Sequence, residues 1–322
     1  MTIGPYPGGK RFAFTIFDDT DVATLENVRP IYRLLEELGM RTTKTVWPEP
    51  CPEGSENFSS SETLEDAEYR EFVIDLQRRG FEIASHGATM ESSRRERTVA
   101  GLERMHDTFG MYPRCHANHA YNRENLYWGA ERIDVPLIRA FYGRFNGMPR
   151  DHYQGGIEGS PYWWGDLCAR HFTYVRNLSF DEINLAKINP SMPYYDPRRP
   201  LAQRWFSSSD AEDAEEFNYL TRPARQEQLE REGGFCIVST HLGKGFERNG
   251  EVHPVTRERL EALARRSGWF PTVGELLDWL ASRRTTTELP APEWQRMQWR
   301  WISDLVRRRW KLRQRRRRGE RI

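Results

Sequence analysis

The sequence is poor in cysteine. Only four are present among 322 residues, namely Cys51, Cys115, Cys168 and Cys236, and no pair has the C-x-x-C spacing. A disulfide framework or a structural zinc site needs more thiols at closer spacing. We therefore expect reduced thiols and exclude both classes.

Long hydrophobic runs are also missing. No segment is apolar over the length of a transmembrane helix, and residues 1–5 do not resemble the start of a secretory signal. We therefore expect a cytoplasmic location, which favours a biosynthetic intermediate as the substrate.

Net charge is nearly absent, but it is distributed unevenly. The chain carries +1 overall, whereas residues 293–322 hold twelve Lys or Arg and three acids, which leaves 36 basic and 44 acidic residues elsewhere. A polar, proline-bearing segment at 285–292 separates the two parts. We predict a main domain over 1–284, a linker over 285–292 and a basic, Trp- and Arg-rich helical tail over 293–322.

The main domain alternates strand and helix patterns. Thr24 precedes a helical pattern that ends at Gly39. Further strands are predicted at 41–46, 81–85, 113–117, 172–178, 204–207 and 235–240, and further helices at 65–79, 92–109, 211–220, 257–266 and 273–281. This order indicates a parallel sheet, most simply closed into a barrel. The irregular stretch 147–200 is expected to shape a substrate site.

Chemistry is expected where the apolar strands end. The first strand, from Phe12, ends in Asp18 and Asp19, and adjacent carboxylates favour a metal ion or a split of their pKa values. The alternative is that both acids cap a turn. His86 and His241 each follow a later apolar strand in the same way.

The segment from Thr15 to Thr20, T-I-F-D-D-T, resembles the T-F-D-D-G motif of the polysaccharide deacetylases, carbohydrate esterase family 4. One residue is inserted after Thr15, and Thr20 stands in place of Gly. With the later motifs the resemblance covers roughly residues 11–283. It implies a distorted parallel (β/α) barrel of about seven strands, with Asp18 as the catalytic base and Asp19 as a ligand of a divalent metal ion, either zinc, cobalt or nickel.

The same resemblance implies a metal ligand at His86, the first position of an H-x-x-x-H motif whose second position is Met90 here. A thioether is a poor ligand for such an ion. We expect His116 or His119 to fill that position, or else to bind substrate hydroxyls or cap a helix.

Two catalytic roles complete the carry-over. Arg114 would hold the base carboxylate ionised. His241 would be the general acid that protonates the leaving nitrogen, the alternative being a structural histidine at a strand end.

The predicted function is therefore removal of an N-acyl group, acetyl or formyl, from a sugar or glycan intermediate. Met90 keeps open a non-catalytic carbohydrate-binding pseudoenzyme with a degenerate metal site. A hydrolase acting on a non-sugar C–N bond, such as a cyclic ureide, is the other alternative.

The tail carries tryptophans among arginines at spacings compatible with one helical face, among them Trp294, Trp299, Trp301 and Trp310. A basic helix with tryptophans is typical of attachment to an anionic membrane surface, here the inner face. A solvated terminus and nucleic-acid binding by residues 315–318 are the alternatives.

Overall fold

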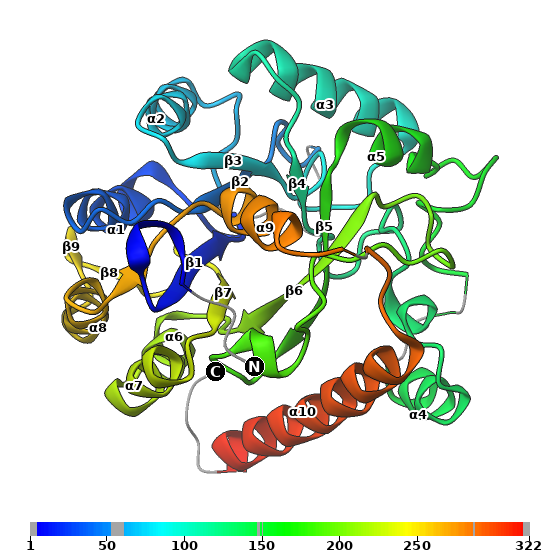
Figure 1. The fold of residues 1–322 in the computed structure, drawn as a ribbon. Coiled ribbons are helices and arrows are strands. Elements are labelled where there is room, and N and C mark those ends of the chain that lie inside the picture. The colour runs from blue at the N-terminus through cyan, green and yellow to red at the C-terminus, as the bar shows by residue number, and fades with distance from the viewer. Residues whose placement is uncertain (1–4, 53–60, 147–148, 150, 286, 318–322) are drawn as a thin grey trace.

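The computed structural model describes residues 5–52, 61–146, 149, 151–285 and 287–317. Seven parallel strands form a closed barrel ringed by helices (Figure 1). In sheet order they are β1 (Phe12–Asp18), β2 (Thr43–Val46), β3 (Glu82–Ser85), β4 (Cys115–His116), β5 (Tyr174–Phe180), β6 (Arg204–Asp210) and β7 (Phe235–Thr240). The barrel closes where β7 pairs with β1. The predicted fold class is confirmed.

Three short strands lie outside this ring. The strand β10 (Gly268–Trp269) pairs in parallel with the beginning of β1, and β8 (Glu247–Arg248) forms a hairpin with β9 (Glu251–Val252). The strand β10 pairs with the amino end of β1, and β2 pairs with its carboxyl end.

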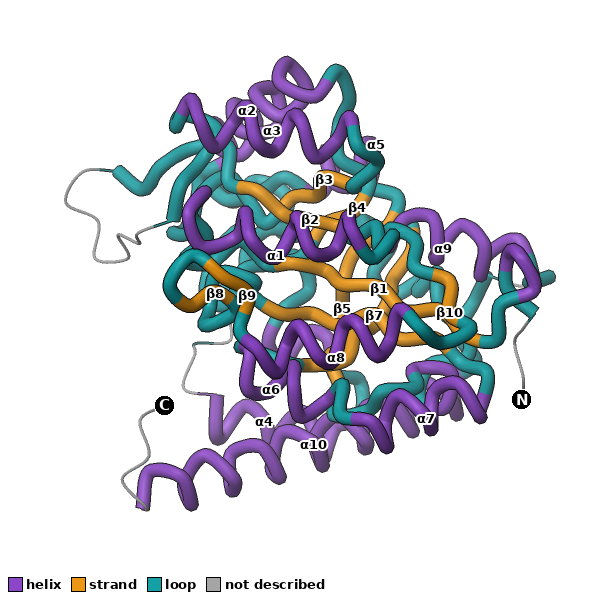
Figure 2. The backbone as a smooth tube through the Cα atoms, turned by 90° about the vertical axis from the view of Figure 1, so that its left-hand side faces the viewer, coloured by secondary structure: helices purple, strands orange, loops and turns teal. Residues whose placement is uncertain are grey.

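The helices cover the outside of the barrel (Figure 2). They are α1 (Leu25–Glu37), α2 (Ala67–Arg78), α3 (Arg95–Phe109), α4 (Pro136–Asn146), α5 (Gly165–His171), α6 (Ala214–Leu220), α7 (Pro223–Glu232), α8 (Pro254–Ala264), α9 (Val273–Ser282) and α10 (Ala291–Arg317). As expected, Thr24 caps α1, and it does so through a capping box with Asn27. None of the described helices is both long and apolar enough to cross a membrane.

The strand β1 divides the protein interior into two cores. All seven of its residues are buried. Ala13 and Phe17 belong to the core inside the barrel, whereas Phe14 and Ile16 belong to the core under the helices. Side chains alternate between the faces of a strand. Asp18, the last residue of β1, and Asp19, which follows it, therefore also point to opposite sides.

The segment 293–302 is not the start of a detached tail, contrary to our expectation. Four side chains of α10 are buried in the same hydrophobic core as the side chains inside the barrel. They are Trp294, Met297, Trp301 and Ile302. The helix packs along β5 and beside α4 (Figure 1). Since the connection from β5 to β6 holds only a short 3₁₀ helix at Leu185–Lys187, α10 supplies the outer cover that this connection lacks.

Candidate metal and acid–base site

Five candidate side chains meet at the carboxyl ends of the barrel strands, where sites of parallel barrels form. Asp19 and Asp21 follow β1, His86 follows β3, His119 follows β4 and His241 follows β7. Asp21 was not among the predicted site residues. It is the third acid of the sequence Asp18-Asp19-Thr20-Asp21, a pattern that was available in the sequence.

Asp18 lies outside this site, which corrects its predicted role as the base. Its carboxylate is fully buried under the helices and forms an ion pair of 2.9 Å with Lys44, which is buried as well. The Tyr32 hydroxyl donates to it at 2.8 Å, and the Leu242 N–H donates to its other oxygen at 2.8 Å. Burial by itself would lower the pKa of Lys44, but the Asp18 carboxylate holds it above its ordinary value. A carboxylate so enclosed cannot reach a substrate.

Asp19 occupies the position predicted for Asp18. It points into the barrel mouth and accepts two hydrogen bonds from the Arg176 guanidinium, at 3.0 and 2.7 Å. Burial by itself would raise the pKa of Asp19, but Arg176, followed by His86 and His241, holds it below its usual range. Asp19 is therefore an ionised, oriented carboxylate, and it is not part of the His86–His119 cluster as a ligand.

Arg114 does not contact either aspartate, which corrects its predicted role. It precedes β4, at the amino end of the strand, and its guanidinium binds Asp278 of α9 at 2.8 and 3.0 Å. Arg176, the third residue of β5, binds the Asp19 carboxylate instead. An arginine inside a predicted apolar strand was the signal in the sequence, because a buried charge needs a partner.

Three imidazoles surround Asp21. The Nε2 atom of His86 lies 3.3 Å from Asp21 Oδ1, and the Nε2 atom of His119 lies 3.4 Å from Asp21 Oδ2. His241 Nε2 lies 3.6 Å from the same Oδ2 atom. Asp21, His86 and His119 form the one group of potential metal ligands found among the described residues.

The opposite nitrogens of these rings fix their tautomers. The Nδ1 atoms of His86 and His241 lie 2.9 and 2.7 Å from the carbonyl oxygens of Ala117 and Glu212, and His119 Nδ1 lies 3.2 Å from the side-chain oxygen of Asn122. A carbonyl oxygen only accepts, so each Nδ1 carries a proton. In its neutral form each ring therefore presents a lone pair at Nε2 to the Asp21 carboxylate.

This donor set fits a divalent cation. Lone pairs directed at a carboxylate repel it unless a cation or protons lie between them. Ligand atoms at about 2.1 Å from one tetrahedral ion lie about 3.4 Å apart, close to the observed separations. Asp21 Oδ1 is buried and makes no well-formed hydrogen bond. The Nδ1–carbonyl contacts are the outer-shell bonds that orient metal-binding histidines.

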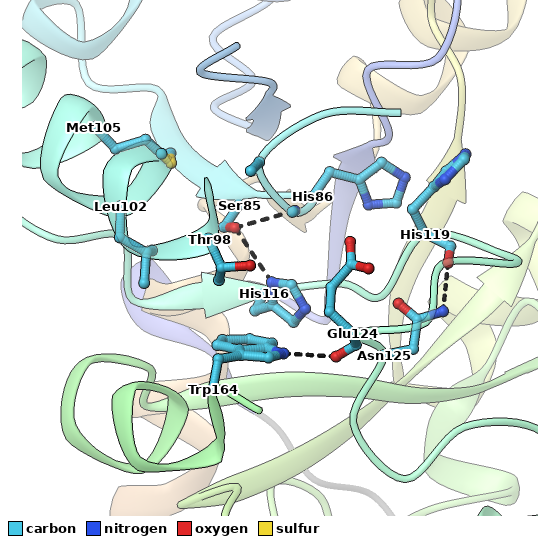
Figure 3. Close-up of a pocket in the computed structure, with 13 residues that line it drawn as sticks. Ser85, His86, Thr98, Leu102, Met105, His116, His119, Glu124, Asn125 and Trp164 are labelled. Atoms are coloured by element: carbon cyan, nitrogen blue, oxygen red, sulfur yellow. Dashed lines mark hydrogen bonds between the residues drawn. The ribbon is translucent and has the colours of Figure 1, made fainter. Parts of the chain in front are cut away.

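His116, the other candidate ligand, lies in the core and away from Asp21. Its Nδ1 and Nε2 atoms are 3.2 and 3.3 Å from Ser85 Oγ and Asn118 Oδ1. Its ring packs against Trp164 (Figure 3). Burial, followed by the proximity of His86, lowers the pKa of His116 to about 3. It is therefore a neutral structural residue, and of the two alternatives expected for the vacant position only His119 lies in the cluster.

Met90 does not lie one helical turn from His86. The residues that follow His86 form bends, and α3 begins only at Arg95. Gly87 has φ of +97°, which redirects the chain directly after the histidine. Position 90 is therefore not placed like the second histidine of a helical H-x-x-x-H pair, and His119 comes from the segment that follows β4.

The buried Trp47 holds two of the imidazoles in place. Its ring stacks on His86 at 6.1 Å and meets the edge of His119 at 5.6 Å. Asn122, which accepts from His119, donates in turn to Glu124 at 3.0 Å. These contacts give the cluster fixed orientations, whereas Asp21, His119 and His241 stay partly open to solvent.

No protein-family model matches the chain, and no curated protein matches it by sequence. Among solved structures, a protein named as a polysaccharide deacetylase from Mycobacterium smegmatis is 15% identical, with 91% of this chain and 98% of that chain covered and a TM-score of 0.53. Puue allantoinase aligns with a TM-score of 0.48 at 12% identity, over 87% of this chain and 94% of that chain.

A protein named as a polysaccharide deacetylase from Pseudomonas aeruginosa PAO1 has a TM-score of 0.47 at 12% identity, with coverage of 87% and 94%. At these identities the likeness shows the fold alone. The conclusion about the fold rests on the Mycobacterium smegmatis structure. The chain has the distorted (β/α) barrel fold found in polysaccharide deacetylases.

Proposed function

We propose that this protein is a metal-dependent hydrolase that removes an N-acyl group, acetyl or formyl, from a sugar or glycan. One observation carries the proposal. The arginine-paired carboxylate of Asp19 lies at the same barrel mouth as Asp21, His86 and His119, with His241 beside them. A base, a cation site and a proton donor are the groups that amide hydrolysis requires.

Asp19 acts as the general base in this proposal. Arg176 keeps the carboxylate ionised and fixes both of its oxygens. An ionised carboxylate at the edge of a cation site can accept a proton from the attacking water.

His241 acts as the general acid. The backbone carbonyl of Glu212 accepts a hydrogen bond from Nδ1, which keeps a proton on that atom. The Nε2 atom is therefore the one that gains and gives up the second proton. It faces the barrel mouth, where a leaving amine would be protonated. A divalent ion held by Asp21, His86 and His119 would polarise the scissile carbonyl and lower the pKa of water.

The ion site is tested by metal content. Purified protein is loaded with zinc, cobalt or nickel, dialysed, and its metal measured by elemental analysis. We expect about one ion per chain in the wild type, and loss of most of it in Asp21→Ala and His119→Ala, since each removes one of three ligands. His116→Gln is the matched control and should retain the ion. Equal retention in all variants would contradict the site.

The reaction is tested with N-acetylated and N-formylated sugars, either free or linked to a nucleotide or lipid. Release of acetate or formate with a new free amine supports the proposal. A protein that binds one ion and these sugars but releases no acid is the carbohydrate-binding alternative. Release of product from a cyclic ureide alone would indicate a non-sugar substrate.

A further inference from the structure

The helix α10 has a buried face and an apolar exposed face. Trp299, Val306 and Trp310 are 49%, 47% and 63% exposed. Their spacings of seven and four residues place them within one narrow stripe of a helix of 3.6 residues per turn. The stripe lies opposite the side that carries Trp294 and Trp301, so packing on the barrel does not cover it.

The neighbouring helix α4 also exposes apolar side chains. It packs beside α10, with Tyr142 and Trp301 at a ring separation of 5.2 Å, and Gln298 of α10 accepts the N–H groups directly preceding α4 at 2.7 and 3.0 Å. Leu137 and Phe141, one turn apart, are 68% and 43% exposed. Of ten exposed large hydrophobic side chains among the described residues, five therefore lie on these two adjacent helices.

The exposed charges of the two helices are positive. Arg296 and Arg307 of α10 and Arg139 and Arg144 of α4 are all exposed. The sequence of α4 holds no acid.

The two acids of α10 are buried. Glu293 accepts a hydrogen bond from Ser191, and Asp304 accepts one from the Asp181 N–H and forms ion pairs with Arg300 and Arg307 of its own helix, at 3.1 and 2.7 Å. The rest of the chain has an excess of acids. The exposed apolar and basic side chains of α10 and α4 thus belong to two adjacent helices at one edge of the protein (Figure 1).

We propose that α10 and α4 bind a lipid surface that carries anionic headgroups. The surface is a convex helix face, which suits a bilayer interface, where tryptophan rings prefer the headgroup level and arginines bind lipid phosphates. The described part of α10 is anchored by its buried tryptophans, so the exposed rings insert from a rigid platform.

The test is cosedimentation of the full-length protein with phosphatidylcholine vesicles, with and without phosphatidylglycerol. We expect sedimentation only with phosphatidylglycerol, at least tenfold weaker in Trp299→Gln/Trp310→Gln. High salt should weaken wild-type binding without abolishing it, because screening leaves the aromatic contribution.

A matched double variant at exposed apolar residues elsewhere, Met111→Gln/Val255→Gln, should bind like the wild type. Arg296→Gln should reduce binding and its salt dependence. Failure of the wild type to sediment with phosphatidylglycerol, or equal binding by both double variants, overturns the proposal. Binding to RNA or DNA with a steep salt dependence and without vesicle binding also overturns it.

Discussion

Asp18 and Asp19 are adjacent, both buried, and each is paired with a cation, yet they belong to different regions of the molecule. Asp18 lies under the helices, where Lys44, Tyr32 and a backbone N–H satisfy its carboxylate. Asp19 lies in the barrel mouth, where Arg176 binds it from one side. Its other side adjoins the imidazole cluster.

The difference shows that the partners of a carboxylate, more than its burial, decide its role. An ion pair closed within the protein contributes to the stability of one arrangement of side chains, and removal of one member leaves an uncompensated charge. A carboxylate paired with a single guanidinium and open toward a site keeps an oxygen lone pair for a proton. The two regions can be separated experimentally.

The largest effect is expected on activity at Asp19. Asp19→Asn removes the proposed proton acceptor, so kcat/KM on the N-acyl sugar that the wild type hydrolyses should fall by roughly 10² to 10⁴. The circular dichroism spectrum and metal content should stay near those of the wild type. Asp18→Asn, corrected for its folded fraction, should retain most activity. A greater loss in Asp18→Asn would reverse the assignment of the two regions.

The next effect is on stability at Asp18. Asp18→Asn leaves the fully buried Lys44 unpaired, which should lower the free energy of unfolding by about 3 to 5 kcal/mol. The double variant Asp18→Asn/Lys44→Met should recover a large part of this loss, because no buried charge remains. Urea denaturation of Asp18→Asn, Lys44→Met and the double variant measures the coupling. Additive losses would show that the pair does not act as a unit.

A smaller effect is expected at Glu124, a buried carboxyl without a cation in hydrogen-bond contact. Burial raises the pKa of Glu124 to about 7, above the ordinary value of 4.5. The protonated form therefore favours the folded state. Its contribution is complete below pH 4.5 and is lost as the pH rises toward 7.

Glu124→Gln should make stability less dependent on pH between 4.5 and 7, by on the order of 1 to 3 kcal/mol over that window. Urea denaturation at several pH values measures this slope. Glu96→Gln on the surface of α3 serves as the control. An unchanged slope in Glu124→Gln would show that the carboxyl is not perturbed by burial.

Much of the architecture could be predicted from the sequence. Apolar runs of strand length alternate with amphipathic helical patterns, and these fixed the barrel, with the predicted strand 235–240 present as β7. The polar residues that follow such runs must meet at one end of a parallel barrel. His86, His119 and His241 could be selected on this ground, and their roles as ligands and acid stay predictions.

The two faces of β1 could not be assigned in this way. Every residue of that strand is buried, so there is no alternation of polar and apolar residues to show which aspartate points inward. Only the tertiary structure shows that Asp19, and not Asp18, points into the barrel mouth, and that Asp21 lies among the imidazoles. Arg114 and Arg176 are likewise equivalent in type, and only the position of each along its strand places one of them in the barrel mouth.

The C-terminal segment shows the same division. Its basic charge, its tryptophans and its helical spacing are properties of the sequence alone. Which tryptophans are buried depends on a gap in the helical cover beside β5, formed by residues more than a hundred positions earlier. A periodic pattern indicates that a helix has distinct faces. Only the contacts of the folded chain determine which face is buried in the core, because burial depends on surfaces that are distant in the sequence.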